Sequence, residues 1–292
     1  MGTEKIGIVT VLYKSETVLE DFFRTLNEQS YQNFILYIID NKSPDDSLNK
    51  SKELAKFVWF KTVFIENDDN YGVAKGNNQG IEAALNDNCD FVLLSNNDVV
   101  LQPDTIENLL LGLTKNNTDM AVPKIYFYDT GLIWSAGGKF NKLRGTTEHF
   151  GYNKKDNKRY ERNYPIDYAP TCFMLIKKDV FTKIGRMDEK YFVYYDDTDF
   201  IYRAKQNKIK LFYICNSVII HKESTCTGKL SDFSLYYSLR NRIYFAKKHR
   251  RFFYIFYIEN LIYHYSIRWL KMIKNRPQWH IILKAIHDGG VL

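Results

Sequence analysis

Short apolar runs alternate with amphipathic segments along residues 6–95 of the chain. Apolar runs bounded by polar residues are typical of buried strands, whereas apolar positions at helical spacing are typical of helices. The pattern predicts the following elements: strands at 6–13, 34–40, 62–67 and 90–95, helices at 16–30 and 73–87, and a helix start at 43–46. Strands that alternate with helices indicate βαβ units, so we expect an α/β fold with a mostly parallel, mixed sheet flanked by helices.

After residue 120 the alternation is less regular. The pattern here predicts a strand, a turn and a strand within 122–138, strands at 173–178 and 210–220, and helices at 179–184, 198–207, 231–249 and 252–275. Residues 141–163 are polar, charged and contain glycine, which predicts a mobile loop. Loops of that length in compact domains are often functional lids, so we expect this one to close over bound substrates.

The positive charge of the chain is concentrated in its last quarter. The net charge is +7; residues 1–222 hold 29 Lys and Arg against 30 Asp and Glu, whereas residues 223–292 hold 12 against 4. We therefore expect an α/β domain at 1–222 and a basic helical extension at 223–292. A basic segment can bind nucleic acid, but the aromatic run at 252–270 is more typical of a helix at a membrane surface.

The extension is expected to dock on an anionic membrane surface, with a homodimer interface as a compatible alternative and with no nucleic-acid partner. Its aromatic run is interrupted by polar residues, so it is too polar to span a bilayer. The cysteines form no CxxC pair, which argues against a zinc knuckle and fits a reducing compartment; they are Cys89, Cys172, Cys215 and Cys226. The first residues lack the apolar segment of a signal peptide, so the expected location is cytoplasmic, peripherally at the inner face of the cell membrane.

Three polar clusters carry the candidate chemistry. They are Ser95–Asp98, which follows an apolar strand, His221, which follows the last one, and the aspartates Asp196, Asp197 and Asp199. Ligands of open α/β sheets bind at the carboxyl ends of the strands. Asp98 and His221 suit Mg²⁺ or Mn²⁺ as ligands, and Asp197 would be a nearby carboxylate that is free to take a proton. Such a set suits transfer of a group away from a diphosphate.

Each cluster also has a structural interpretation. Asn and Asp are common in turns, a single histidine is more often structural, and aspartates at a helix start complement the helix dipole. The aromatic neighbours of Asp197 favour a base, because desolvation raises the pKa of a carboxylate. Arg203 lies four residues after Asp199, so we expect the two to pair across one helical turn.

Two further segments could bind a nucleotide. Asp40 ends the second strand, where its carboxylate could accept the N3–H of uracil or thymine; the alternative is a helix N-cap. The segment 70–80 combines three glycines with four amides at the start of a helix. Glycine lets backbone approach a ligand closely and helix N-termini attract phosphate, so this segment predicts a phosphate site, with an ordinary loop as the alternative.

Together these residues resemble the family 2 glycosyltransferases of GT-A fold, in particular the rhamnosyltransferase- and galactofuranosyltransferase-type members. Residues 70–80 resemble the family's N-x-G-x-A-x-x-N-N-x-G segment. Residues 188–203, DEKYFVYYDDTDFIYR, resemble its FDE-x-FF-x-Y-x-ED-x-D-x-x-x-R signature, which is the most specific match. Asn96–Asp98 stand where the family has its DxD motif, and His221 matches its late metal-binding histidine.

The resemblance implies a role for each of these residues. Asp98 and His221 would bind the divalent cation, Mn²⁺ or Mg²⁺, and Asp197 would be the catalytic base. Asp40 would contact the base of a UDP- or dTDP-sugar donor. The other donor-binding residues that it implies are Thr10, Leu12, Tyr13, Asn70, Gly72, Lys75, Asn77, Asn78, Asn96 and Asn97.

The implied reaction is inverting, metal-dependent transfer of a sugar, with a rhamnose-like sugar favoured, to a hydroxyl of a glycan or lipid-linked acceptor in cell-surface polysaccharide assembly. The chain departs from the family pattern at Asn96, the first DxD position, and at Asp196, where Glu is usual. Two alternatives stay open. A sugar-nucleotide pyrophosphorylase would need an early glycine-rich loop, which Lys14–Glu16 does not provide, and a catalytically impaired glycan-binding subunit is suggested by Asn96.

Overall fold

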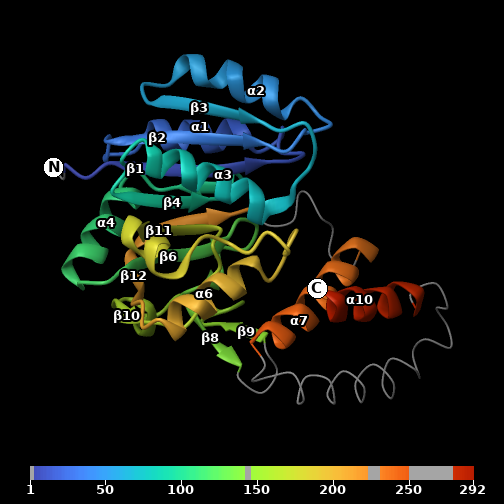
Figure 1. Cartoon of the computed structure of the whole chain (residues 1–292). Helices are drawn as coiled ribbons and strands as arrows, with labels where there is room; N and C mark the ends of the chain where they lie inside the picture. Colours follow the sequence, from blue (N-terminus) through green and yellow to red (C-terminus); the bar gives the residue numbers. More distant parts are fainter. Residues whose placement is uncertain (1–2, 142–145, 223–230, 250–278) are drawn as a thin grey trace.

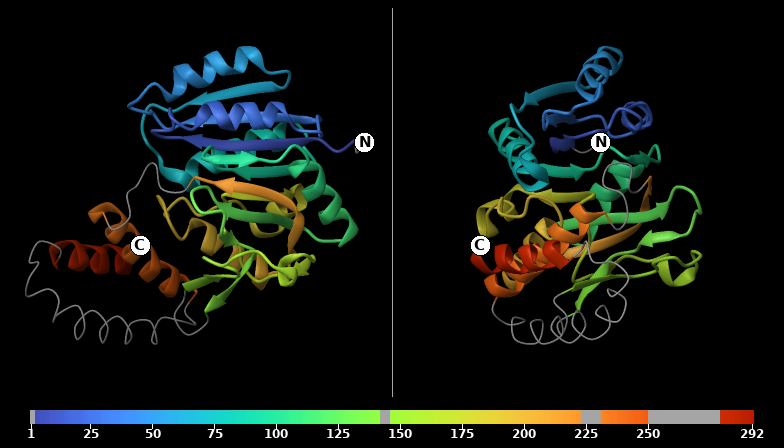
Figure 2. Two further views of the ribbon diagram at one scale, coloured as in Figure 1. Left: turned by 180° about the vertical axis from the view of Figure 1, so that it is seen from behind. Right: turned by 90° about the vertical axis from the view of Figure 1, so that its right-hand side faces the viewer.

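The computed structural model describes residues 3–141, 146–222, 231–249 and 279–292 (Figure 1). Its main body is a mixed sheet with helices on both sides, and two C-terminal helices lie beside it (Figure 2). This arrangement confirms the expected α/β class.

The first half of the chain follows the predicted pattern closely. Its elements are β1 (Ile6–Leu12), α1 (Leu19–Asn27), β2 (Phe34–Asp40), α2 (Ser47–Leu54), the 3₁₀ helix η1 (Ala55–Phe57), β3 (Lys61–Glu66), α3 (Gly72–Asn86) and β4 (Phe91–Ser95). Almost every residue of β1, β2 and β4 is buried. Continuous burial is typical of parallel strands that helices cover on both faces, which explains why these strands read as unbroken apolar runs.

The second half contains shorter elements, several of which the pattern did not predict. They are β5 (Val99–Leu101), α4 (Thr105–Lys115), β6 (Met120–Phe127), β7 (Ile133–Ser135), β8 (Gly138–Asn141), β9 (Thr146–His149), the 3₁₀ helix η2 (Lys158–Tyr160), β10 (Tyr164–Pro165), β11 (Phe173–Lys177), α5 (Lys178–Ile184), α6 (Asp196–Gln206) and β12 (Leu211–His221). The strand predictions that became β11 and β12 are confirmed, as are the helix predictions that became α5 and α6. The pattern missed α4 and β5.

The prediction of a single loop at 141–163 is wrong in part. Thr146–His149 form β9, which pairs with β8 in a separate two-stranded antiparallel sheet, and Lys158–Tyr160 form η2. Two threonines in β9 favour an extended strand, although the segment is too polar to look like one in the sequence. Residues 142–145 of this segment lie outside the described residues.

The strand order brings the carboxyl ends of several strands to one edge of the sheet. The order is β10-β12-β6-β11-β4-β1-β2-β3, with β5 paired to β12 and β7 paired to β6. β4, β1, β2 and β3 are parallel, whereas β11 runs antiparallel to both β4 and β6. Two successive reversals return β6, and β12 parallel to it, to the direction of β4. The ends of β1, β2, β4 and β12, where candidate site residues lie, therefore share one edge.

The hydrophobic core does not divide at residue 222. One apolar cluster joins the sheet to α3, α5 and α6, and a second joins it to α1 and α4. The helix α7 (Asp232–Lys248) contributes Tyr244, Phe245 and Ala246 to the first cluster. The helix α7, which lies within the predicted extension, therefore packs into the main core.

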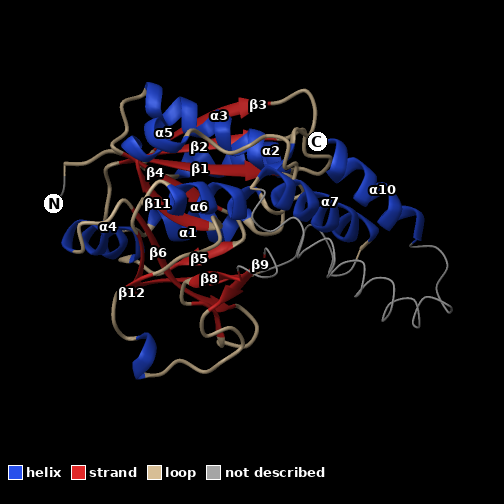
Figure 3. Ribbon diagram, turned by 60° about the horizontal axis from the view of Figure 1, so that its bottom comes forward, coloured by secondary structure: helices blue, strands red, loops and turns tan. Residues whose placement is uncertain are grey.

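The last helix, α10 (Trp279–Val291), packs along α7, where Ile282 and Ala285 contact Leu239 (Figure 3). The helix predicted at 231–249 is confirmed as α7, whereas α10 was not predicted. The helix predicted at 252–275 lies outside the described residues. No helix in the described part of the chain has both the length and the apolar character needed to cross a membrane.

Candidate active site

Asp98 and His221 face each other at the carboxyl edge of the sheet. His221 is the last residue of β12 and pairs in register with Val99 of β5, directly after Asp98. The backbone N–H of Lys222 also donates to the carbonyl of Asp98, at 2.9 Å. These backbone contacts bring His221 Nε2 to 3.1 Å from Asp98 Oδ1. Two residues more than a hundred positions apart thus form one pair.

The chemistry of this pair fits a divalent cation. Burial raises the pKa of Asp98, but the hydrogen bond and charge of His221 outweigh burial and hold that pKa below its usual value. The separation of 3.1 Å matches two neighbouring ligands of an octahedral shell, which lie about 3 Å apart when each is about 2.1 Å from the ion. Among the described residues no group of three or more His, Cys, Asp or Glu side chains could hold a metal. The pair by itself would supply two ligands to a cation.

Asp197 is the accessible carboxylate of the second cluster. It lies in the first turn of α6, where Oδ2 accepts a hydrogen bond of 2.6 Å from the Tyr168 hydroxyl. Oδ1 accepts from the backbone N–H of Thr198, at 2.5 Å. These two donors fix the orientation of a side chain that is only half-buried. Asp197 can therefore reach a substrate hydroxyl while its geometry is held by the protein.

The neighbouring Asp196 is buried and has a different character. Burial, together with the negative charge of Asp197, raises the pKa of Asp196 to about 8. Asp196 is therefore mainly protonated at neutral pH and does not add a second negative charge beside Asp197. Because Asp196 is almost fully enclosed, Asp197 is the better placed of the two to meet a substrate.

Asp199, the third aspartate, is an anchor within the protein. Its Oδ2 lies 2.8 Å from Arg203 Nε, which confirms the predicted pair across one helical turn. Its Oδ1 lies 2.8 Å from both Lys248 Nζ and His249 Nε2, at the end of α7. Burial raises the pKa of Asp199, but His249, Lys248 and Arg203 together lower it to about 2. Asp199 is thus a permanent anion that ties α6 to α7.

A line of aromatic rings connects the Asp98–His221 pair to Asp197. The Trp134 ring lies 5.0 Å from the His221 ring and 4.8 Å from the His149 ring. The His149 ring lies 5.8 Å from the ring of Tyr168, whose hydroxyl donates to Asp197. The Asp98–His221 pair and Asp197 therefore lie at the two ends of one line of side chains, which come from β7, β9 and the segment before β11.

A buried thiol supports the same conclusion. Burial raises the pKa of Cys172 well above its usual value, and the charges of Asp98 and Asp197 raise it further. Both carboxylates must lie near the sulfur to act on it. The carbonyl of Cys172 also accepts a hydrogen bond of 2.7 Å from the backbone N–H of Asn96, which places this residue directly beside the DxD-like turn.

The sequence did not reveal Trp134, His149 or Tyr168 as site residues. Trp134 lies in a strand of three residues, and His149 ends a strand inside the segment that was predicted to be a loop. Tyr168 precedes β11 without any periodic context. The one local feature that could have drawn attention to Trp134 is the pair of glycines that follows it closely, in IWSAGG at 133–138.

The predicted donor residues near β1 and β4 lie together. Asn97 Nδ2 donates to the carbonyl of Val11 at 2.8 Å and lies 3.5 Å from Thr10 Oγ1, so it ties the ends of the two strands. Leu12 is buried at the end of β1 and Tyr13 is half-buried just after it, whereas the Asn96 side chain is exposed. Contact of these residues with a donor stays a prediction.

Asp40 forms a local turn rather than a helix cap. Both of its carboxylate oxygens accept from the backbone N–H of Ser43, at 3.3 and 3.2 Å. The helix α2 begins later, at Ser47, so the alternative of an N-cap at Asp40 is wrong. Its place at the carboxyl end of β2 remains compatible with contact to a nucleobase, which stays a prediction.

The glycine-rich segment at 70–80 binds mainly to other parts of the protein. Gly72 has a φ of +81°, and a Cβ atom at this position would lie 2.3 Å from the carbonyl oxygen of Phe192. The same oxygen accepts from the backbone N–H of Val73, at 2.7 Å. Gly72 therefore makes room for Phe192, and its contact with a donor stays a prediction. Asn70 supports this turn by accepting from the N–H of Gly72.

The asparagines of this segment hold the chain after α5. Asn78 Nδ2 donates to the carbonyl of Met187 and Asn78 Oδ1 accepts from its N–H, both at 2.9 Å. Asn77 Nδ2 lies 3.6 Å from the Met187 sulfur. Lys75 differs, because its Nζ lies only 3.7 Å from the ring centre of Tyr71 and its side chain is half-buried. The two asparagines thus have structural partners, and donor contact by Lys75 stays a prediction.

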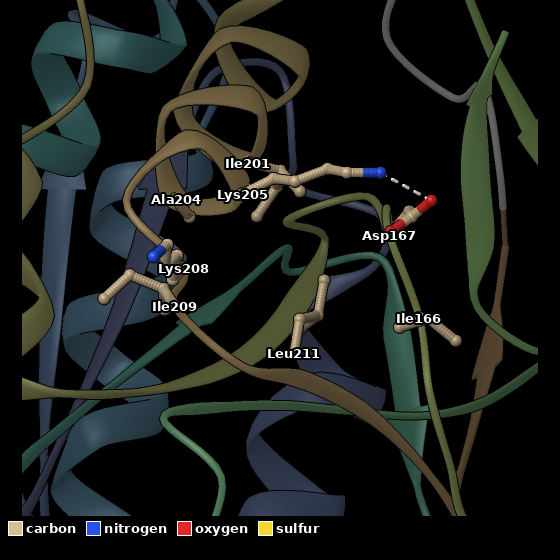
Figure 4. Close-up of a pocket in the computed structure, with 8 residues that line it drawn as sticks. All are labelled: Ile166, Asp167, Ile201, Ala204, Lys205, Lys208, Ile209 and Leu211. Carbon is tan, nitrogen blue, oxygen red and sulfur yellow. Dashed lines mark ion pairs between the residues drawn. The ribbon is translucent and has the colours of Figure 1, made fainter.

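A pocket elsewhere on α6 does not belong to this site. It lies at the C-terminal end of the helix and is bordered by Ile166, Ile201 and Leu211, with Lys205 paired to Asp167 at 2.6 Å (Figure 4). Asp197 occupies the opposite end of α6, about two helical turns away.

Comparisons with known proteins identify the family of the chain. The sequence model described as Glycosyl transferase family 2 matches residues 7–185. The hexosyltransferase Agl10 of low-salt glycan biosynthesis from Haloferax volcanii is 24% identical over 259 residues, which cover 82% of this chain and 74% of the relative. The dTDP-rhamnosyl transferase RfbF of Shigella flexneri is 22% identical over 259 residues, which cover 83% and 80%.

Solved structures show the same fold. The mannosyltransferase PcManGT from Pyrobaculum calidifontis, in complex with GDP-Man and Mn²⁺, matches with a TM-score of 0.60 and 13% identity over 99% of this chain and 74% of its own. GalNAc-T7 with UDP, GalNAc and Mn²⁺ matches with a TM-score of 0.65 and 12% identity over 84% of this chain. This chain spans about half of the GalNAc-T7 chain, namely 48%.

Proposed function

Because the chain belongs to glycosyl transferase family 2 and has the GT-A fold, we propose that it transfers a sugar, with inversion, from a nucleoside-diphosphate sugar to a hydroxyl of a glycan or lipid-linked acceptor. The observation that carries the proposal is the line of ring contacts that connects the Asp98–His221 pair to the carboxylate of Asp197. Family membership makes the chain a glycosyltransferase and argues against a sugar-nucleotide pyrophosphorylase.

The Asp98–His221 pair is assigned to the diphosphate of the donor. Asp98 and His221 would hold one Mn²⁺ or Mg²⁺ together with the phosphate oxygens. The Nδ1 atom of His221 is buried without a hydrogen-bond partner in the described residues, so the ring is held by packing against Trp134 and by its Nε2 contact. A bound cation would stabilise the charge that develops on the departing diphosphate.

Asp197 is assigned to the acceptor. Its carboxylate takes the proton of the acceptor hydroxyl while the oxygen bonds to the anomeric carbon, and the bond from that carbon to the diphosphate breaks on the opposite face. Tyr168 and Thr198 hold the carboxylate in place through the hydrogen bonds described above. Asp196 stays protonated, because its pKa is raised to about 8, and so leaves the negative charge on Asp197.

The donor is assigned to UDP- or dTDP-sugars, with a rhamnose-like sugar favoured. The dTDP-rhamnosyl transferase RfbF of Shigella flexneri supports this choice, although Agl10 is named only as a hexosyltransferase. A panel of UDP-, dTDP- and GDP-sugars, tested by thermal shift with Mn²⁺ and then by turnover, checks it. Stabilisation and turnover with dTDP-rhamnose would support the assignment. Stabilisation by a donor without any turnover would favour the impaired glycan-binding subunit that Asn96 suggests.

The C-terminal extension is assigned to the cytoplasmic face of the membrane, where lipid-linked glycans would be the acceptors. The support is its charge, 12 Lys and Arg against 4 Asp and Glu in residues 223–292. Arg250 and Arg251 directly precede the aromatic run and are assigned as lipid contacts; both lie outside the described residues. Co-sedimentation of the full-length protein with anionic and neutral vesicles tests the proposal, with the double change Arg250→Glu and Arg251→Glu as the comparison. Equal pelleting of both proteins on both kinds of vesicle would contradict the proposal. Size-exclusion chromatography tests the alternative, in which the extension forms a homodimer.

A further inference from the structure

The helix α7 is attached to the loop that precedes the proposed base. Asn241 is fully buried, and its Nδ2 donates to the carbonyls of Val193 and Tyr194, at 2.7 and 2.9 Å. Its Oδ1 accepts a hydrogen bond of 2.7 Å from Arg240 Nη1. A buried amide whose donors and acceptor are all used is costly to disturb, because each lost partner leaves a desolvated polar group.

The same helix holds the earlier part of this loop. Asp188 Oδ2 accepts from the Tyr244 hydroxyl at 2.9 Å and lies 2.7 Å from Lys248 Nζ. Arg240 Nη2 donates to the carbonyl of Lys190, at 3.0 Å. Contacts from one face of α7 therefore follow the loop from Asp188 to Tyr194.

The loop needs such support because its backbone is strained. Tyr194 and Tyr195 have φ values of 63° and 64°, in the left-handed region that bulky residues rarely adopt. Such conformations persist where the surroundings hold them, and they are common at functional sites. Tyr195 is the residue directly before α6, so the backbone angles of Tyr194 and Tyr195 determine the position of Asp197 in the first turn of the helix.

A second set of contacts fixes the helix that follows the loop. Lys248 Nζ and His249 Nε2 both lie 2.8 Å from Asp199 Oδ1, two residues after Asp197. The loop before the base and the first turn of α6 are thus both bound to α7, from Asn241 at its middle to Lys248 at its end.

From these contacts we propose that α7 is a positioning element of the active site, in which Asn241 and Lys248 hold Asp197 in its reactive place without touching substrate. The proposal rests on the proposed function, because it needs Asp197 to be the base. It gives the first part of the C-terminal extension a role in turnover, in addition to any role in membrane docking.

The first test uses Asn241→Ala in the full-length protein. Misplacement of a reacting group by about 1 Å can cost roughly 100-fold in rate, so we expect kcat for donor turnover to fall roughly 10- to 100-fold. The Kd for UDP with Mn²⁺ should stay within about twofold, because Asp98 and His221 lie on the sheet and not on this loop. Asn207→Ala is the matched control: Asn207 also donates its amide to a backbone carbonyl, that of Arg203 at 2.9 Å, but at the exposed far end of α6.

A second pair of variants covers the case in which Asn241→Ala does not fold. Lys248→Met keeps most of the length of the side chain but removes its contacts to Asp188 and Asp199, whereas Lys248→Arg keeps the charge. We expect Lys248→Met to lower kcat by roughly tenfold and Lys248→Arg to recover most of it. Equal kcat values for the two Lys248 variants, close to wild type, would overturn the proposal.

The decisive comparison introduces Asn241→Ala, or Lys248→Met, into an Asp197→Asn background. If α7 acts through Asp197, the second change should lower residual turnover by less than about twofold, because coupled residues are not additive. Full additivity would mean that α7 supports the fold alone, and the positioning role would be wrong.

If Asp197→Asn itself leaves turnover unchanged, the proposed base fails and the positioning role fails with it. A damaging Asp197→Asn beside harmless α7 variants overturns the positioning role and leaves the base in place.

Discussion

Asp98 and Asp197 lie at the two ends of one line of ring contacts, but the protein supports them in different ways. Asp98 lies between β4 and β5, and its partner His221 ends β12, which pairs in register with β5. Asp197 lies outside the sheet, at the junction of a loop and α6, after two residues with left-handed backbone. Its position depends on Tyr168 and, through the loop, on α7.

The difference shows which kind of residue depends on distant parts of the chain. Backbone hydrogen bonds of paired strands hold Asp98 and His221, so side-chain changes on the helices should affect them little. Asp197 is held by the Tyr168 hydroxyl and the backbone N–H of Thr198, and the loop before it is bound by the side chain of Asn241, 47 positions after Tyr194. Binding of the diphosphate should therefore be robust to changes on the helices, whereas the rate of the chemical step should not.

The largest effect is expected for Asp98→Ala. The variant should lose all metal-dependent binding of nucleoside diphosphate, because His221 alone cannot replace the charged ligand. Thermal shift with UDP, with Mn²⁺ or with EDTA, measures the loss. Asp104→Ala is the control, since Asp104 is an exposed aspartate six residues later. UDP binding that is insensitive to EDTA in wild type and variant alike would sink the metal assignment.

The next effect is expected for Asp197→Asn. Loss of the base should lower turnover by roughly 10²–10⁴-fold, the usual contribution of a general base. Asp196→Asn should have a much smaller effect, because a neutral amide resembles the protonated carboxyl that Asp196 has at neutral pH. Steady-state rates of the two variants measure the difference. A larger loss of turnover in Asp196→Asn than in Asp197→Asn would assign the base to Asp196 instead.

A smaller effect, on stability, is expected for Asp199→Ala. Removal of one partner from a buried ionic cluster leaves Arg203, Lys248 and His249 without their anion, and should cost roughly 3–5 kcal/mol in the free energy of unfolding. Glu28→Ala is the control, because Arg24 and Glu28 form a pair with the same spacing on the surface. That pair should contribute less than about 1 kcal/mol. Urea unfolding measures both, and similar losses would show that the Asp199 cluster is no stronger than a surface pair.

The last effect is expected in the pH dependence of stability, rather than in activity, and it concerns Asp196. Its pKa is about 8 in the folded protein and about 3.9 when unfolded, so the folded state holds the proton more tightly. This contribution to stability is fully present below about pH 4 and is lost as the pH rises towards about 8. In Asp196→Asn the free energy of unfolding should fall less across that range. An identical pH dependence in both proteins would show that Asp196 does not titrate there.

The sequence predicted one side of this comparison better than the other. β1, β2 and β4 are buried on both faces, so their apolar runs marked them to within about two residues, and the polar residues after β4 marked Asp98. His221 was found because it follows the last apolar run. The pairing of β5 with β12, which brings Asp98 and His221 together, cannot be read from either apolar run and is known only from the structure.

The surroundings of Asp197 could not be predicted in the same way. Trp134 and His149 lie in strands of three and four residues, which are too short to show a period. Asn241 looks like an ordinary polar residue of a helix, and its role appears only when the chain brings it to the carbonyls of Val193 and Tyr194. Contacts made across the fold leave no local pattern, so the sequence marked Asp197 as a candidate base but not the residues that hold it.

The most direct test of the account is a calorimetric titration of UDP, with Mn²⁺, into wild type, Asp98→Ala and Asp197→Asn, followed by donor turnover on the same samples. The account predicts that Asp197→Asn binds UDP as wild type does, within about twofold, but turns over roughly 10²–10⁴-fold more slowly. Asp98→Ala should lose the Mn²⁺-dependent binding itself. Loss of UDP binding in Asp197→Asn, or normal turnover by it, would contradict the division of the site into a diphosphate pair and a base.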